Sequence, residues 1–272
     1  MRPDVKINDL WMFAMGWLRE EIDFPTPQSE SMLRSMVEAS LGAQVVDGGT
    51  ATVRSFINEL LMRCYPNESA VKASFVDGVI LKQTARAVSI FELPVGDSRA
   101  DFCKVNGHSS AYEVKTDLDT FYRLEKQLSD YYDVFDYVYI ITSDTRWRAL
   151  PDYVPETCGI YSYHQKRDGR YAFTLRQHSQ LNRSHDSEKQ LSIMPKRDLV
   201  IESGFGANLS KEALAAQCLT AFDSRTINAM FKSYLKRRYG NRWEYFKSVR
   251  PQIFEIDYEW FFRNNLNPSI IY

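Results

Sequence analysis

The sequence predicts an α/β protein whose core follows the order helix, three strands, helix, strand. Three β-rich runs with tight connections, residues 87–95, 100–106 and 110–116, carry the first part of this prediction. A helical run then leads to residues 136–142, an unusually apolar strand of the kind that is buried on both faces. We expect the first three strands to form an antiparallel meander, to which the helix crossover adds a parallel neighbour.

The composition is that of an ordinary globular protein. Of the 272 residues, 44% are hydrophobic and 25% are charged, which is enough to bury a substantial core in one or two domains. No run of 18 apolar residues and no signal segment is present, so we expect a soluble, cytoplasmic protein. The four cysteines form no CxxC pair, which excludes a zinc ribbon and a thioredoxin motif.

The first region, residues 1–65, is predicted to be helical. Apolar positions at helical spacing favour helices over residues 6–22, 29–41 and 50–64. The region is acidic, since residues 1–40 carry seven Asp and Glu against four Lys and Arg. Acidic helical regions more often pack or bind a partner than catalyse, so we expect this region either to pack on the rest of the chain or to bind a protein partner.

The predicted core spans residues 66–145. Its first helix begins after Asn67, a side chain typical of the N-cap position. Its second helix, residues 120–135, is expected to be capped by Asp117 or Asp119.

The third region, residues 146–272, is predicted to pack on the core as a hairpin followed by basic helices. An Asp-Gly pair at residues 168–169 is a good hairpin signal. The elements that we expect are strands 160–164 and 171–176, a mobile polar loop over 177–190, and helices 211–222 and 224–239.

The last of these helices begins a strongly basic stretch. Residues 225–250 carry eight Lys and Arg against one Glu, a net charge of +7 in a chain whose total is −1. Such a stretch is either a solvated helix face or a surface that contacts phosphates and stacks bases. The side chains for the second reading are Lys236, Arg237, Arg238, Tyr239, Arg242 and Trp243.

Charged residues converge on one face of the predicted meander. Asp101 begins the second strand, and Glu113 and Lys115 share a face of the third because side chains alternate along a strand. A hairpin over residues 106–107 brings Asp101 beside that pair. Two carboxylates and an ammonium on one sheet face are costly unless they hold a cation or another charge. The sequence therefore predicts a Mg²⁺ site.

The order of these residues resembles a nuclease pattern. Gly96-x4-Asp101, Glu113-Val114-Lys115 and Gln127-x3-Tyr131 are similar to the GxxxxD, ExK and QxxxY motifs of one branch of the PD-(D/E)XK nuclease superfamily. That branch includes RecB-type and lambda-exonuclease-like nucleases. The phrases SRAD, YEVKT and DYVYIIT also resemble a little-characterised group of bacterial and phage proteins in the superfamily. The resemblance covers about residues 67–144 and implies a restriction-endonuclease-like core within the α/β fold.

The resemblance implies a magnesium-dependent deoxyribonuclease. Asp101 and Glu113 would hold Mg²⁺, which prefers carboxylate and water ligands, with the Val114 carbonyl as a third ligand. The ion would polarise the scissile phosphate and lower the pKa of a bound water. Lys115 would orient that water and stabilise developing negative charge. We expect Mn²⁺ to substitute for Mg²⁺ and DNA to be the substrate.

The helices are expected to contribute further site residues. Gln127 and Tyr131 lie four apart on one helical face and would reach the site or a DNA phosphate. Relatives often carry an acidic residue on the helix before the first strand. Glu68 fits that position best, with Glu59 and Glu92 as rivals, and would be an additional metal ligand.

Less specific interpretations stay open. Glu113 and Lys115 could form an exposed ion pair, which contributes little stability, and Gln127 and Tyr131 could simply pack. The nuclease fold could be a catalytically silent binding module, or a toxin or defence component that acts only with a partner. The expected settings for an active enzyme are repair, recombination and phage-related defence.

Overall fold

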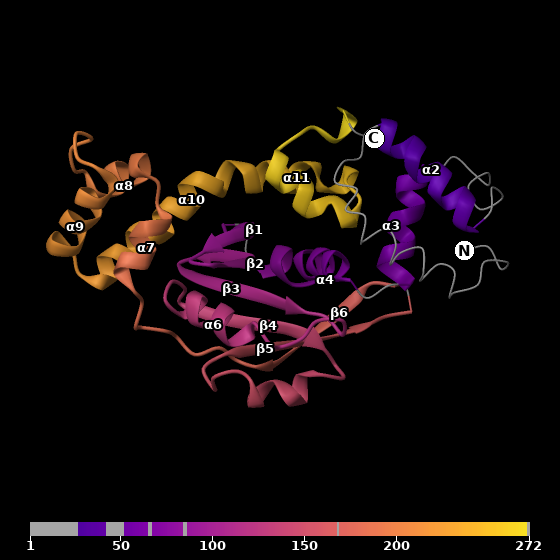
Figure 1. Ribbon diagram of the computed structural model, residues 1–272, viewed down its shortest axis with the longest axis horizontal. Helices are drawn as coiled ribbons and strands as arrows, with labels where there is room; N and C mark the ends of the chain where they lie inside the picture. Colours follow the sequence, from indigo (N-terminus) through magenta and orange to yellow (C-terminus); the bar gives the residue numbers. More distant parts are fainter. Residues whose placement is uncertain (1–26, 42–51, 65–66, 84–85, 168, 271–272) are drawn as a thin grey trace. The chain divides into compact units, whose positions relative to one another are not determined.

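The computed structural model describes residues 27–41, 52–64, 67–83, 86–167 and 169–270 (Figure 1). It is a mixed α/β protein built around one six-stranded sheet, which confirms the predicted fold class. The chain divides into two compact units. Unit 1 takes the described residues of Met1–Val76, Gln165–Ala172 and Phe246–Tyr272, and unit 2 those of Asp77–His164 and Phe173–Tyr245. The predicted helix 6–22 lies outside the described residues, and the three predicted regions stay a prediction.

The strands follow one another across the sheet in chain order. They are β1 (Val88–Val95), β2 (Ser98–Asn106), β3 (His108–Lys115), β4 (Tyr137–Ser143), β5 (Gly159–Gln165) and β6 (Tyr171–Gln177). β1, β2 and β3 pair antiparallel, whereas β4 runs parallel to β3 and β5 runs parallel to β4. The predicted meander with a parallel neighbour is therefore confirmed.

Along the chain, the described helices come before β1, between β3 and β4, and after β6. They are α2 (Pro27–Leu41), α3 (Val53–Cys64), α4 (Glu68–Phe75), α5 (Leu81–Gln83), α6 (Leu124–Tyr132), α7 (Ser187–Ile193), α8 (Lys196–Ser203), α9 (Lys211–Ala221), α10 (Ser224–Val249) and α11 (Tyr258–Asn264). Asn67 caps α4 as predicted, since its side chain accepts the N–H of Ala70 at 2.9 Å. None of these helices is long and apolar enough to cross a membrane.

Three predicted boundaries are wrong. The polar segment 177–190 is not all loop, because Asp186 caps α7 by accepting the N–H of Lys189 at 3.0 Å. α10 does not end near residue 239 but continues to Val249. A glycine inside a helix costs about 1 kcal/mol, and burial of Trp243 one turn beyond Gly240 offsets that cost.

The third wrong boundary is the start of α6. This helix begins at Leu124, after Arg123, and no side chain caps it. Asp119 instead folds back and accepts the N–H of Thr116 at 2.7 Å and its hydroxyl at 2.8 Å. Asp117 accepts a hydrogen bond from the hydroxyl of Ser143. Both acids therefore shape the loop after β3 rather than the helix.

The central strands carry different chemistry on their two faces. On one face an aromatic row crosses the sheet, in which the ring of Tyr112 lies 6.1 Å from that of Phe102 and stacks 5.1 Å from that of Tyr139. Gly159 stands opposite Tyr139 on β5, where a Cβ would lie 2.2 Å from the tyrosine ring. The neighbouring row, which points to the other face, holds the carboxylates described below. α6 covers that face over β2 and β4 (Figure 1).

A buried carboxylate fixes α10 to the sheet within unit 2. Asp136, just before β4, accepts hydrogen bonds from the Ser109 amide at 2.7 Å, Asn228 at 2.8 Å and Lys232 at 3.0 Å. Nε2 of His185 lies 3.2 Å from the same carboxylate. Burial alone would raise the pKa of Asp136. The hydrogen bonds, that of His185 first, outweigh burial and hold the pKa well below its ordinary value.

Unit 1 has its own core and its own buried charge pair. Nε of Arg54 on α3 donates to Asp257 at 3.1 Å, and both side chains are buried. The ring of Phe246 packs against Tyr258 at 5.3 Å and Phe262 at 6.2 Å. The ion pair joins α3 to the residue before α11, and the ring contacts join the end of α10 to α11.

Candidate active site

Asp101 and Glu113 lie opposite each other in the meander. β2 and β3 pair Phe102 with Tyr112, and continuing this antiparallel register places Asp101 across from Glu113. The two residues are almost fully buried, at 9% and 2% exposed. Directly opposed residues of neighbouring strands share a face of the sheet. The structure thus brings together the two carboxylates that the sequence singled out.

Asp101 is anchored by the backbone of the neighbouring strand. Its Oδ2 accepts the N–H of Val114 at 2.6 Å. Val114 is 2% exposed and its N–H is engaged by this bond. The predicted use of its carbonyl as a metal ligand stays a prediction.

Glu113 is the centre of a hydrogen-bonded cluster. Its Oε1 lies 2.6 Å from Nζ of Lys115 and also accepts from the amide nitrogen of Gln127. Its Oε2 accepts from the hydroxyl of Tyr131 at 2.6 Å. Lys115 comes from the same strand, and the other two donors come from successive turns of α6. Gln127 and Tyr131 thus lie in one cluster with Glu113, and their expected part in catalysis stays a prediction.

The pKa of the Tyr131 phenol is raised by its surroundings. Its hydroxyl also lies 2.8 Å from the carbonyl of Arg99. Burial raises the pKa of Tyr131 far above its ordinary value, and the charge and hydrogen bond of Glu113 raise it further, followed by the charges of Asp101 and Glu92. Tyr131 is therefore protonated at neutral pH and can donate to Glu113.

Gln127 presents a buried acceptor to the same cluster. Its amide nitrogen is directed to Glu113. Its amide oxygen is buried and meets no hydrogen-bond donor among the described residues. A buried polar atom of this kind costs about 1–3 kcal/mol, which calls for an explanation.

A third carboxylate stands in the same row. The pairs Phe91–Phe102 and Leu93–Ala100 place Glu92 of β1 across from Asp101, and a carboxylate oxygen of each lies within 4.8 Å of the other. The Glu92 backbone has a φ of +55°, a left-handed conformation that residues other than glycine rarely adopt. Strain of this kind is concentrated at functional sites. The tight turn at residues 96–97 is the sequence signal that sets this register.

The two other acidic candidates lie in unit 1. Glu68 is the first residue of α4 and pairs with Lys72 at 2.5 Å. Glu59 on α3 pairs with Arg63 at 3.4 Å. Both form ion pairs within their own helices, and a role for Glu68 as a metal ligand stays a prediction. Of the three candidates, Glu92 is the one that lies in unit 2 with Asp101.

The basic stretch is partly structural. Arg237 pairs with Asp198 at 2.8 Å and with Glu202 at 3.0 Å, which joins α10 to α8. Trp243 is 2% exposed and its ring packs 6.3 Å from that of Phe102. The prediction that Trp243 stacks bases is therefore wrong, because its ring is part of the core. Lys236 and Arg238 are exposed.

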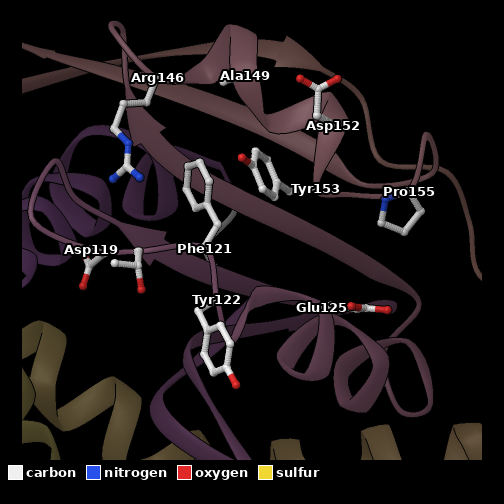
Figure 2. A pocket seen from close by; sticks show the side chains of 10 residues that line it. Asp119, Phe121, Tyr122, Glu125, Arg146, Ala149, Asp152, Tyr153 and Pro155 are labelled. Atoms are coloured by element: carbon white, nitrogen blue, oxygen red, sulfur yellow. The ribbon is translucent and has the colours of Figure 1, made fainter.

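A pocket of about 980 Å³ opens in unit 2 beside the loop that follows β3 (Figure 2). Phe121 lies at its centre, with the guanidinium of Arg146 4.2 Å from its ring and the ring of Tyr153 5.0 Å away. Tyr122 and Glu125 line it from the start of α6. The sequence does not predict this pocket, because its walls come from segments that follow two different strands.

A model of bacteriophage P4 protein cII matches residues 62–257, more than two thirds of the chain. The chain belongs to the bacteriophage P4 protein cII family. The family match contains the carboxylate row, Lys115, the two α6 side chains and the whole pocket. No curated protein and no solved structure matches the chain.

Proposed function

We propose that this protein is a metal-dependent nuclease that hydrolyses phosphodiester bonds of DNA and has a restriction-endonuclease-like core. The observation that supports it most is the cluster in which Asp101, Glu113 and Lys115 meet on one sheet face. Gln127 and Tyr131 complete the cluster in the chain order of the GxxxxD, ExK and QxxxY motifs. The chain order helix, three strands, helix, strand agrees with the αβββαβ core of PD-(D/E)XK nucleases.

The residues present fit Mg²⁺. It takes hard oxygen ligands. Glu92 and Asp101 offer carboxylate oxygens within 4.8 Å of each other, and Glu113 stands across from Asp101 on the next strand. Two carboxylates this close repel each other unless a cation or a proton offsets their charge. The buried amide oxygen of Gln127 would accept a hydrogen bond from a water of the hydrated ion. Mn²⁺ accepts the same ligands.

Lys115 is the group that would act on the attacking water. When bound, the ion would polarise the scissile phosphate and lower the pKa of a water that it coordinates. An ammonium has three donors, and one of those of Lys115 is directed to Glu113 at 2.6 Å. The others would orient the water and stabilise negative charge on the phosphate oxygens.

The two α6 side chains would position Glu113. Gln127 and Tyr131 donate to different oxygens of this carboxylate, so its plane is fixed before a ligand arrives. Their proposed role is therefore to orient the carboxylate rather than to contact the phosphate.

The test is cleavage by the purified full-length chain. Labelled single-stranded, linear duplex and circular DNA are incubated with Mg²⁺, with Mn²⁺ or with EDTA. We expect metal-dependent cleavage that falls by about a hundredfold or more in Glu113→Gln, Asp101→Asn and Lys115→Met. Cleavage that survives any of these three substitutions overturns the proposal.

Matched variants separate loss of chemistry from loss of fold. Lys104→Met removes a half-buried lysine from β2, and Asp97→Asn removes an exposed carboxylate from the turn before β2. Both are expected to keep full activity. Circular dichroism melts of all five variants show whether the fold survives.

One observation favours a second function. Both oxygens of Glu113 already accept hydrogen bonds from the chain itself, as in a closed structural network. The alternative is therefore a catalytically silent nuclease fold that binds DNA or a protein partner. Calorimetric titration decides between them, since a silent module binds DNA equally well with and without Mg²⁺ and cleaves no substrate. Repair, recombination and phage-related defence are the settings that we propose for an active enzyme.

A further inference from the structure

The pocket beside β3 exposes aromatic surface to solvent. Tyr122 is 92% exposed and Tyr153 is 54% exposed, and both line this one pocket (Figure 2). Phe121 between them is already in contact with Arg146 and Tyr153. Aromatic side chains gathered at the surface are typical of a binding site, whereas single exposed ones are common. The faces of Tyr122 and Tyr153 are the ones open to a ligand.

Residues that line the pocket are close in sequence to residues of the proposed catalytic cluster. Asp119 comes four residues after Lys115, and Glu125 comes two residues before Gln127. Arg146 donates to the carbonyl of Thr116, which fixes the segment after β4 to the loop after β3. A ligand in the pocket would therefore lie next to the strand and the helix that carry Lys115 and Gln127.

The charges around the pocket indicate which part of a nucleic acid it accepts. Three carboxylates, those of Asp119, Glu125 and Asp152, line the pocket against one guanidinium, that of Arg146, so a phosphate is disfavoured inside it. Carboxylates accept hydrogen bonds from the exocyclic amino groups of bases, as they do from the amino group of cytosine. Arg123 and Arg148, which are exposed and adjacent in sequence to lining residues, would meet phosphates outside it.

We propose that this pocket binds an unpaired, amino-bearing base of a single-stranded nucleic acid. The base stacks on the exposed ring of Tyr122 or of Tyr153, and its amino group donates to Glu125 or Asp152. A base inside a duplex cannot reach such a pocket, so the strand must be single or frayed there. This inference rests on the proposed nuclease function and gives its substrate class: a single strand or an unpaired end.

Binding measured without a divalent metal tests the pocket apart from catalysis. Fluorescein-labelled oligo-dC, oligo-dT and a duplex, each of about 12 nucleotides, are titrated with the full-length chain in EDTA by anisotropy. We expect tighter binding of oligo-dC than of oligo-dT, and weaker binding of the duplex. Tyr122→Ala with Tyr153→Ala should weaken oligo-dC binding by about tenfold or more, since stacking contributes that much for each base.

Two further variants identify the contacts. Tyr122→Phe with Tyr153→Phe keeps both rings and should bind oligo-dC as tightly as the unchanged protein. Glu125→Gln with Asp152→Asn should remove the preference for oligo-dC over oligo-dT. Equal affinity in the double alanine variant overturns the proposal. A second result also overturns it: a basic peptide binds the unchanged protein but not the double alanine variant, while oligo-dC still binds that variant.

The outcomes separate this inference from the nuclease proposal. Binding that depends on both tyrosines, with no metal-dependent cleavage of any DNA, rejects the nuclease and keeps the base pocket. Cleavage that is unchanged in the double alanine variant for both single strands and duplex rejects the pocket and keeps the nuclease.

Discussion

The hydroxyl of Tyr131 lies 2.6 Å from Oε2 of Glu113, deep in the fold and on the face that α6 covers. One turn earlier Gln127 donates to the other oxygen of the same carboxylate. Two side chains of α6 therefore hold the buried carboxylate of Glu113. The effect of these hydrogen bonds on stability and their effect on activity can be measured separately.

Tyr131→Phe removes the hydrogen bond to Oε2 of Glu113 and keeps the aromatic ring. The carboxylate of Glu113 then loses a buried donor, which should lower the free energy of unfolding by about 1–3 kcal/mol. Urea denaturation measures this loss. Tyr132→Phe, on the same helix, removes a hydroxyl that Thr157 contacts at the surface and should cost clearly less. Equal losses in the two variants would show that the bond to Glu113 has no special weight.

The carboxylate of Asp136 should make the protein sensitive to acid. Its pKa is lowered in the folded state, so the unfolded chain binds a proton more readily. The stability that this gives is fully present above the ordinary carboxyl pKa of about 3.9 and is lost as the pH falls below it. Asp136→Asn should remove about 3 kcal/mol at neutral pH, because Lys232 is left without its buried partner.

The pH dependence separates this role from simple packing. The difference in unfolding free energy between Asp136→Asn and the unchanged protein should begin to narrow below pH about 4 and shrink steadily as the pH falls further. Asp133→Asn is the matched variant, since Asp133 forms a more exposed pair with Lys189. It should change stability by less than about 1 kcal/mol. A gap between the Asp136→Asn and unchanged proteins that is constant with pH would contradict the assignment.

Gly96, the glycine of the GxxxxD motif, should resist substitution for two reasons. Its φ is +59, and a Cβ at this position would lie 3.2 Å from the carboxylate of Asp130. Gly96→Ala should cost about 1–2 kcal/mol from the left-handed backbone and more from the contact. Gly107→Ala, at φ +75 with nothing within 4 Å of its Cβ, supplies the backbone cost alone. Equal melting temperatures in the two variants would rule out the contact with Asp130.

Local signals in the sequence were enough to predict most of the fold. Alternating side chains marked the strands, and Asn67 marked the start of α4 because a cap acts within three residues. The start of α6 was missed because Asp119 has a closer competing partner in Thr116. Side chain to backbone bonds of this kind can form a turn as easily as a helix cap.

The site was only partly predictable, for a reason of register. Asp101, Glu113 and Lys115 could be placed together because one hairpin and strand alternation connect them. Glu92 joins them only through the exact pairing of β1 with β2, in which a shift by one residue would turn its side chain to the other face. The pocket could not be foreseen, since its walls are the irregular segments after β3 and β4, which carry no periodic pattern in the sequence.

We expect Glu92 to lower the stability of the metal-free protein and to contribute to metal binding. Its left-handed backbone is strained by about 1–3 kcal/mol, and its carboxylate lies within 4.8 Å of that of Asp101. Glu92→Gly relieves the strain and the repulsion, and loses a pair with the exposed Arg99 that contributes little. The metal-free protein should therefore melt at a higher temperature. The further rise on adding Mg²⁺ should shrink, because a ligand is lost and stabilisation follows the affinity for the ion. Glu92→Gln keeps the strained backbone and removes only the repulsion, so it should lose the Mg²⁺ response with a smaller gain in stability than Glu92→Gly. A Mg²⁺-induced shift in melting temperature that is unchanged in both variants would exclude Glu92 from the metal site.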